Sequence, residues 1–378
     1  MPLLHPPEAF RSETILARAA KYGFANPLAV ELFLWDLEVA AQLQSSSRDL
    51  ILKGGAAAQV FVPPEKQRGS RDIDIVTSLD EDVVEGIMRS TLAPLEGVSF
   101  KPHTPKKPKK GLPLRTYFVS TRSAVQTKPL EVKADFLLED IPLSAVETRG
   151  VETFAVTTAT LRCFRPETLV GDKILTLANG SIGLENMADC PKHIYDICAL
   201  LESPRFHEFE HTIAAIETLT PVEGRIRGID VAPDRALSDV VRFAETKLGP
   251  IDTSMADEDL TSRFEAFEQF FAPRGQKATL QEWSARALKV RFVASLARAT
   301  LADQMSPAEA MKSIGLALEH ETKLRLVAGD EAAEIRKLLL RHQKAKVPYF
   351  KELRGKPVHR VFWQVVTPAN LDELVSKA

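Results

Sequence analysis

Apolar and polar residues alternate in several short runs in the first half of the chain. Residues 72–77 read DIDIVT and residues 130–137 read LEVKADFL. Successive side chains of a strand point to opposite faces, so a two-residue period predicts strands with one buried face. On the same grounds we predict further strands at 50–53, 98–103 and 114–121.

Other segments have helical patterns. Residues 27–44 are apolar on most faces and begin beside Asn26, a favourable capping residue, which predicts a largely buried helix. Residues 54–61 and 80–92 read as further helices. Strand signals fade after about residue 160. A helix that contains Asp172 and Lys173 begins at Pro166, a second spans about 186–202, and further helical runs follow at 206–218, 233–247, 255–271, 279–302, 306–319 and 330–345.

These patterns predict an α+β protein, in which a mixed β-sheet with helices is followed by an all-helical C-terminal region. We expect an N-terminal helical segment at 1–47, the sheet core at 48–160 and the helical region at 161–378. A chain of 378 residues is long enough for this organisation.

Composition narrows the class of protein. Hydrophobic residues make up 44% and charged residues 26%, as in soluble globular proteins. The formal net charge of −2 means that binding to a polyanion would need local basic patches. No apolar run has the length of a membrane span, the N-terminus lacks the features of a signal peptide, and the three cysteines form no CxxC pair. We therefore expect a soluble, cytoplasmic protein without a membrane partner.

Two acidic residues in the 72–77 run are the first chemical signal. Asp72 and Asp74 share one strand face and repel each other unless a cation lies between them. Carboxylates and substrate phosphates are the usual ligands of Mg²⁺. A third carboxylate is expected from a neighbouring strand, with Asp135 as the candidate and Glu131 as the reserve. Taken without the 72–77 run, these two acids would read as an ordinary solvated face.

A glycine pair supplies the second signal. Gly54 and Gly55 follow a short apolar strand and precede a helix, and glycine lets the backbone approach a phosphate closely. The order strand, glycine pair, helix, loop and acidic strand is more specific than either motif alone. Transfer from a nucleoside triphosphate requires this combination of positioning and charge neutralisation.

Four segments together resemble a known family. They are KGG at 53–55, RGSRDIDI at 68–75, DKILTL at 172–177 and KHIYDICAL at 192–200. They resemble the AbiEii/AbiGii family of toxin nucleotidyltransferases, which includes the MenT toxins and belongs to the DNA polymerase β-type nucleotidyltransferase superfamily. The resemblance covers about residues 48–200. Gly55 stands where many superfamily members have serine, and His193 stands where the family has aspartate.

The resemblance implies an NTP-dependent nucleotidyltransferase whose catalytic core is 48–160, with the first part of 161–378 completing the active site. It implies Mg²⁺, or Mn²⁺, held by Asp72, Asp74 and Asp135, and Lys173 as a catalytic phosphate clamp. The residues implied in nucleotide binding are Lys53, Gly54, Gly55, Arg68, Ser70 and Asp196.

The resemblance also implies a toxin that acts on RNA, especially the 3′ end of tRNA, and that has a cognate antitoxin protein. Two basic stretches are candidates for RNA contact, at 101–110 and 335–360; in the second, Tyr349, Phe350 and His359 are interleaved and available to stack on bases. The residues leave open a protein or small-molecule acceptor, and also a catalytically inert protein that binds nucleotide or RNA.

Overall fold

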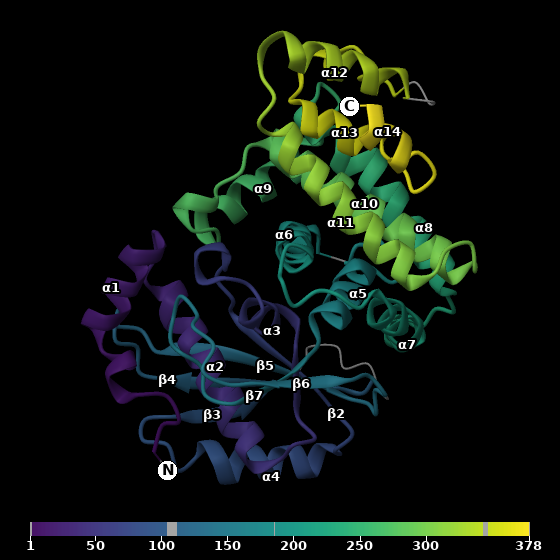
Figure 1. Ribbon diagram of the computed structural model, residues 1–378. Coiled ribbons are helices and arrows are strands. Elements are labelled where there is room, and N and C mark those ends of the chain that lie inside the picture. The colour runs from purple at the N-terminus through teal and green to yellow at the C-terminus, as the bar shows by residue number, and fades with distance from the viewer. Residues whose placement is uncertain (1, 104–111, 185, 343–346, 378) are drawn as a thin grey trace. The chain divides into compact units, whose positions relative to one another are not determined.

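The computed structural model describes residues 2–103, 112–184, 186–342 and 347–377 (Figure 1). The chain divides into two compact units. The sheet unit comprises Met1–Leu169 and Phe267–Lys277, and the helical unit comprises Val170–Ala266 and Ala278–Ala378. The division falls within α5 (Pro166–Thr176), and the N-terminal segment 1–47 belongs to the sheet unit.

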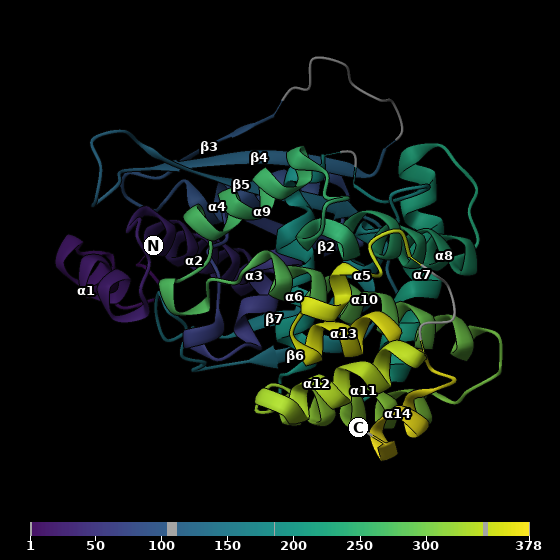
Figure 2. The same ribbon diagram turned by 90° about the horizontal axis from the view of Figure 1, so that it is seen from above.

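The sheet unit contains a seven-stranded mixed sheet in the order β3-β4-β5-β2-β1-β7-β6. Strand β2 pairs in parallel with β5 and antiparallel with β1. Figure 2 shows β3, β4 and β5 running side by side. The strands are β1 (Ile51–Lys53), β2 (Asp72–Thr77), β3 (Ser99–Pro102), β4 (Leu114–Thr121), β5 (Leu130–Leu138), β6 (Ala145–Thr148) and β7 (Leu161–Phe164). The mixed sheet with its many helices confirms the predicted α+β class.

Alternation along the strands separates a buried face from a polar face. Ile73 pairs with Ala134, which pairs with Tyr117, and all three side chains are at most 1% exposed. Helix α2 (Leu28–Ser46) packs on the sheet and on α4 (Glu81–Leu92). The α2 side chains from Val30 to Leu43 are nearly all buried, which confirms the prediction for that segment. The opposite face carries the acidic residues.

Two strands were not predicted. The expectation that strands end near residue 160 is wrong for β7, which pairs in parallel with β1 through Leu52 and Cys163. Three of its four residues are buried, so it shows little of the alternation that identifies a half-exposed strand. Strand β6 completes the edge by pairing with β7. Helices α1 (Ser12–Tyr22) and α3 (Gly54–Val60) also belong to this unit.

The helical unit packs around α10 (Leu280–Leu301), which contacts α6, α7, α8, α11 and α13. Trp283 of α10 is fully buried, and Ser306 and Glu309 form a capping box that starts α11. Helices α13 and α14 were not predicted. The other helices are α6 (Cys190–Leu201), α7 (Phe209–Arg227), α8 (Pro233–Phe243), α9 (Glu258–Phe270), α11 (Pro307–Leu324), α12 (Gly329–Arg341), α13 (Val358–Val365) and α14 (Leu371–Lys377). The end of α9, from Phe267, belongs to the sheet unit.

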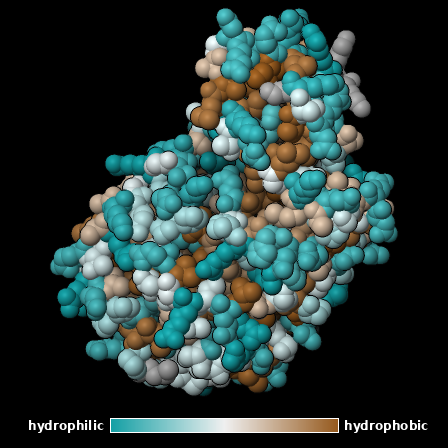
Figure 3. Space-filling view, in the orientation of Figure 1, coloured by the Kyte–Doolittle hydropathy of each residue, from teal (hydrophilic) through white to brown (hydrophobic). Residues whose placement is uncertain are grey.

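Polar residues cover most of the face shown in Figure 3, with apolar residues in smaller groups between them. Within the described residues, no helix combines the length and the apolar character needed to cross a membrane.

Candidate active site

The acidic face of the sheet is built around β2. Asp72 and Asp74 are partly exposed, whereas Ile73 and Ile75 between and after them are at most 1% exposed. The apolar side chains therefore anchor the strand in the core, and this burial fixes the direction in which both carboxylates point.

The parallel pairing of β2 with β5 places Asp135 opposite Asp74 in register. Paired residues point to the same face of a sheet, so the three aspartates share it. Thr116 donates a hydrogen bond to one Asp135 carboxylate oxygen at 2.5 Å, and Lys133 forms an ion pair with the other. Glu131 lies on the same face and pairs instead with Lys101 at 3.4 Å.

The glycine pair lies against this acidic cluster. Lys53 pairs with Asp74 in register, and Gly54 follows with a φ of 71°. A Cβ atom at Gly54 would stand 1.8 Å from the Asp74 Oδ2 atom, so no other residue fits there without displacing the carboxylate. Sequence reasoning placed the glycines near the substrate phosphates; the structure places Gly54 against the acid itself.

Gly55 brings in two more of the predicted residues. A Cβ atom at Gly55 would lie 2.9 Å from the Arg68 Nη2 atom and 3.2 Å from the Ser70 hydroxyl oxygen. Arg68 is only 3% exposed, unlike most loop arginines, and its Nη1 atom donates to the Gly69 carbonyl at 2.7 Å. One end of the acidic cluster is thus bordered by five of the predicted residues: Lys53, Gly54, Gly55, Arg68 and Ser70.

Two glutamines that sequence reasoning missed hold this loop in place. The Gln67 side-chain nitrogen donates to the carbonyls of Gln59 and Val62, both at 2.7 Å. The Gln59 side-chain oxygen accepts from the Arg68 backbone at 2.9 Å. These buried bonds fix the path of the chain into β2 and thereby orient Arg68 and Ser70. Their only sequence signal is two amides flanking a proline-rich loop.

Asp36 of α2 is a further residue that sequence reasoning missed. Its side chain is 0% exposed, and neither carboxylate oxygen has a hydrogen-bond partner among the described residues. By contrast, the buried Glu31 and Glu38 of the same helix accept hydrogen bonds, from Ser123 and His5 respectively. The signal was an acid inside an otherwise apolar helix, but that signal does not distinguish Asp36 from its two bonded neighbours.

The electrostatic field of the cluster is negative. Burial raises the pKa of Asp36 well above its usual range, and the charges of Asp72 and Asp74 raise it further. Burial alone would lower the pKa of Lys133, but Asp135, Asp72 and Asp74 raise it. Both shifts go in the direction that excess negative charge produces.

A cation is the natural complement to this field. Three carboxylates on one face supply the hard oxygen ligands that Mg²⁺ prefers. As the side chains stand, the oxygens of Asp135 bond Thr116 and Lys133, and within the described ranges no three acidic, histidine or cysteine side chains converge on one metal position. The donor chemistry fits a divalent cation, and Lys133 would have to release Asp135 for the third ligand to join.

Lys173 and Asp196 meet each other within the helical unit. The Lys173 Nζ atom lies 2.7 Å from the Asp196 carboxylate, and the side chains are 2% and 0% exposed. Tyr195, which precedes Asp196 in α6, is also buried. The ion pair joins the two predicted segments, DKILTL and KHIYDICAL, at their charged residues.

Two of the three aromatic residues predicted to stack on bases in the stretch 335–360 are buried, whereas Lys337, Lys351 and Arg354 of the same stretch are exposed. Tyr349 and His359 are buried, and they bond Gln364 and Glu282 at 3.2 and 2.7 Å, so neither ring is available to stack on bases. Arg360 is 0% exposed and pairs with Asp252. Residues 343–346 and most of the 101–110 stretch lie outside the described residues.

A family model for the nucleotidyl transferase AbiEii toxin of type IV toxin–antitoxin systems matches residues 36–303. The chain belongs to this family. The AbiEii assignment confirms the predicted resemblance and makes the chain a nucleotidyltransferase of a toxin family. The matched span contains Asp36, the acidic cluster and the Lys173–Asp196 pair.

Comparison with solved structures found several similar chains. JHP933 from Helicobacter pylori is 14% identical, with a TM-score of 0.41 over 82% of this chain and 99% of that one. MenT4, a nucleotidyltransferase toxin from Mycobacterium tuberculosis, is 15% identical, with a TM-score of 0.45 over 76% of this chain and 99% of that one. No curated protein matches the AbiEii chain described here.

Proposed function

We propose that this AbiEii protein transfers a nucleoside monophosphate from a nucleoside triphosphate to the 3′-hydroxyl of an RNA, with tRNA as the expected acceptor. One observation carries the proposal: the Gly54 backbone stands against Asp74, and Asp135 lies opposite Asp74 on the paired strand. This arrangement supports a phosphate beside a cluster of carboxylates, as nucleotidyl transfer requires.

Each residue has a distinct task in this proposal. Asp72, Asp74 and Asp135 would hold Mg²⁺, or Mn²⁺, which when bound neutralises charge on the phosphates. The glycine backbone, Arg68 and Ser70 receive the triphosphate, with Lys53 beside them. The family resemblance implies that Lys173 acts as a phosphate clamp, and Asp196, 2.7 Å away, holds its ammonium group in position.

The transfer itself is a single displacement at phosphorus. The acceptor oxygen forms a bond to the α-phosphorus while the bond from that atom to the pyrophosphate breaks. Pyrophosphate leaves, and the hydroxyl proton passes to a carboxylate of the acidic cluster. The protein contributes chiefly position and charge, since this chemistry needs little covalent assistance.

The test is incubation with total RNA, Mg²⁺ and each labelled nucleoside triphosphate in turn. We expect label in RNA with the wild-type protein, and a loss of roughly 100- to 1,000-fold or more in Asp74→Asn and Asp135→Asn. Glu96→Gln, an exposed acid of the same unit, is the matched control and should retain activity. Loss of activity in Glu131→Gln with Asp135→Asn unaffected would move the third carboxylate to the reserve position.

Other outcomes would contradict the proposal. Label in a protein or a small molecule, with none in RNA, would show that the acceptor is that molecule and not RNA. Triphosphate binding by calorimetry without turnover on any acceptor would favour an inert binding protein.

Family membership also supports a protein antitoxin as partner: expression of the chain should inhibit growth, and the Asp74→Asn variant should not.

A further inference from the structure

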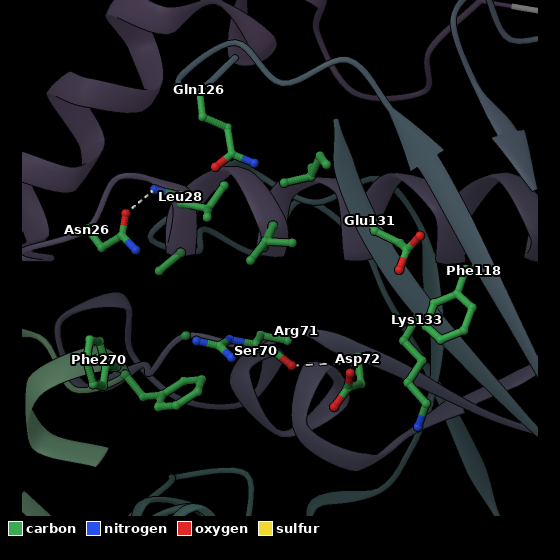
Figure 4. Close-up of a pocket in the computed structure, with 15 residues that line it drawn as sticks. Asn26, Leu28, Ser70, Arg71, Asp72, Phe118, Gln126, Glu131, Lys133 and Phe270 are labelled. Atoms are coloured by element: carbon green, nitrogen blue, oxygen red, sulfur yellow. Dashed lines mark hydrogen bonds between the residues drawn. The ribbon is translucent and has the colours of Figure 1, made fainter. Parts of the chain in front are cut away.

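The sheet unit contains a cavity of about 440 Å³ beside Asp72, at the start of β2 (Figure 4). We call it the Asp72 pocket. Its volume is within the range typical of small-molecule sites. Leu28, Ala29 and Leu32 at the start of α2 give it an apolar wall, and Phe118 and Leu130 extend this wall on β4 and β5. It thus offers apolar surface directly next to a predicted catalytic carboxylate.

The walls of the pocket are fixed by buried hydrogen bonds. Glu31 of α2 is 1% exposed and accepts from the Ser123 hydroxyl at 2.6 Å and from the Ala124 backbone at 2.5 Å. The Ser123 hydroxyl in turn accepts from the Gln126 backbone at 3.1 Å. These bonds hold the loop between β4 and β5 to α2, so Gln126 is positioned at the pocket before any ligand arrives.

An aromatic surface lies on another side of the pocket. The Arg71 guanidinium is 4.6 Å from the centre of the Phe271 ring, and the Gly69 backbone donates to the Phe271 carbonyl at 3.0 Å. Phe267 stacks on Phe271, with ring centres 5.8 Å apart. The guanidinium lies over one face of the Phe271 ring, and unpaired bases stack on aromatic and guanidinium planes of this kind.

Two side-chain amides at the pocket could hydrogen-bond the edge of a base. Asn26 and Gln126 are both exposed there, and each amide has donors and an acceptor. The Asn26 oxygen accepts from the Leu28 backbone at 3.1 Å, which leaves its amino group to donate (Figure 4). The charged lining balances, with Arg71 and Lys133 against Asp72 and Glu131, so the apolar wall, stacking surface and amide edges suit a neutral nucleobase better than a phosphate.

The strand order indicates whether the pocket faces the terminal base of the acceptor or the base of the incoming triphosphate. Strand β1, which leads into Gly54, pairs with one side of β2, and β5 pairs with the other. In-line displacement places the leaving pyrophosphate and the attacking hydroxyl on opposite sides of the phosphorus. If the triphosphate lies over the glycines on the β1 side, the attacking hydroxyl approaches from the β5 side. The pocket is on that side, because it is lined by Leu130 and Lys133 of β5 and by Phe118 of β4.

We propose that the Asp72 pocket binds the base of the terminal nucleotide of the RNA acceptor, the nucleotide whose 3′-hydroxyl attacks. The proposal rests on the proposed function and adds to it a place for the acceptor base, which adjoins the triphosphate site at Ser70. The base stacks beside Phe271, the amides of Asn26 and Gln126 contact its edge, and the 3′-hydroxyl is thereby held near the carboxylates.

The experiment measures transfer to total tRNA, with RNA and nucleoside triphosphate varied separately. Phe271→Ala and Gln126→Ala are compared with Leu16→Ala, which truncates an exposed apolar residue of the same unit outside the pocket. We expect Phe271→Ala to raise the KM for RNA about 5- to 100-fold, the range produced by losing one stacked base. Gln126→Ala should raise the same KM less, and the KM for the triphosphate should change less than about twofold in both.

A second measurement uses two synthetic 12-nucleotide RNAs that differ only in whether the last nucleotide carries a base. The wild-type protein should prefer the complete RNA, and Phe271→Ala should lose that preference. Altered choice among the four triphosphates, with the KM for RNA unchanged, would assign the pocket to the incoming base and overturn the proposal. Absence of transfer to any RNA by the wild-type protein would instead be the failure of the proposed function.

Discussion

The sheet unit and the helical unit differ in how they accommodate charge. In the sheet unit, Asp72, Asp74 and Asp135 gather on one face, and their field reaches the buried Asp36. In the helical unit, Lys173 contacts Asp196 at 2.7 Å, Lys289 contacts Glu321 at 2.8 Å and Arg360 contacts Asp252 at 3.2 Å.

The difference separates charges that support the fold from charges that work against it. A paired buried charge satisfies its partner, and removing one member leaves the other unpaired. Like charges on one sheet face repel and destabilise the folded state until a cation or substrate joins them. Such an arrangement is typical of functional sites. By its geometry, the Lys173–Asp196 pair is a buried ion pair that supports the fold. In the proposed function, Lys173 also acts on the substrate phosphates.

The largest expected effect comes from breaking that buried pair. Lys173→Met leaves the Asp196 carboxylate without its ammonium partner, and we expect the free energy of unfolding to fall by about 3–5 kcal/mol. Lys173→Met combined with Asp196→Leu should recover most of this loss, because no charge is then left buried. Urea denaturation measures both variants.

The control for this comparison is the exposed pair of Lys323 and Glu319, which lies in the same unit at 2.8 Å. Lys323→Met should change the free energy of unfolding by less than about 1 kcal/mol. A double variant of Lys173 and Asp196 no more stable than the single variant would show that the two side chains are not coupled.

The second effect concerns the acidic face. We expect Mg²⁺ at about 100 times its dissociation constant to stabilise the wild-type protein by about 2.7 kcal/mol, because it binds only the folded chain. Asp72→Asn should lose most of this gain, and without metal it should be slightly more stable than wild type because one repulsive charge is gone. Thermal melting with EDTA and with Mg²⁺ measures both. An equal response to Mg²⁺ in the two proteins would remove Asp72 from the metal site.

The last prediction concerns how the stability of each unit depends on pH. The raised pKa of Asp36 means that the folded chain keeps its proton while the unfolded chain loses it near pH 4. Its contribution to stability is therefore full below about pH 4 and is lost as the pH rises toward the folded pKa. Asp36→Asn should be stabilising by an amount that grows with pH above about 4, at about 1.4 kcal/mol per pH unit at most.

The opposite slope is expected in the helical unit. Burial alone would raise the pKa of Glu321, but Lys289 and Arg325 lower it. Its contribution is present above about pH 4.3 and is lost as the pH falls through the folded pKa. The destabilisation caused by Glu321→Gln should therefore shrink below about pH 4. Denaturation from pH 3 to 8 measures how the effect of each substitution on the free energy of unfolding changes with pH. Slopes of the same sign for Asp36→Asn and Glu321→Gln would contradict the comparison.

Much of the acidic face was predictable from local pattern. The alternation in DIDIVT fixed both the strand and the shared direction of Asp72 and Asp74, and β2 has the predicted bounds. The same reasoning placed Asp135 on a strand face with Glu131 and Lys133. It named Asp135 as the candidate and Glu131 as the reserve, but the register that puts Asp135, and not Glu131, opposite Asp74 is seen only in the pairing of β5 with β2.

Other features depended on contacts between distant segments. The buried state of Tyr349 and His359 follows from Gln364 and Glu282, which no local pattern connects to them. Strand β7 was missed because burial on both faces removes alternation. Asp36 was missed because it lies on α2, far in sequence from the β2 acids Asp72 and Asp74 whose charges act on it. The Asp72 pocket likewise draws on α2, β4, β5 and the segment around Phe271.

The sequence by itself determined the chemistry of this protein: a glycine pair, two alternating acids and the segments that mark its family. Those features are local, because alternation and backbone freedom are set by adjacent residues. The tertiary structure alone decided which acid faces Asp74, that Gly54 lies against it, and that an apolar pocket with amide edges opens beside Asp72. Register and packing are set by burial across the whole fold, which no short stretch of sequence contains.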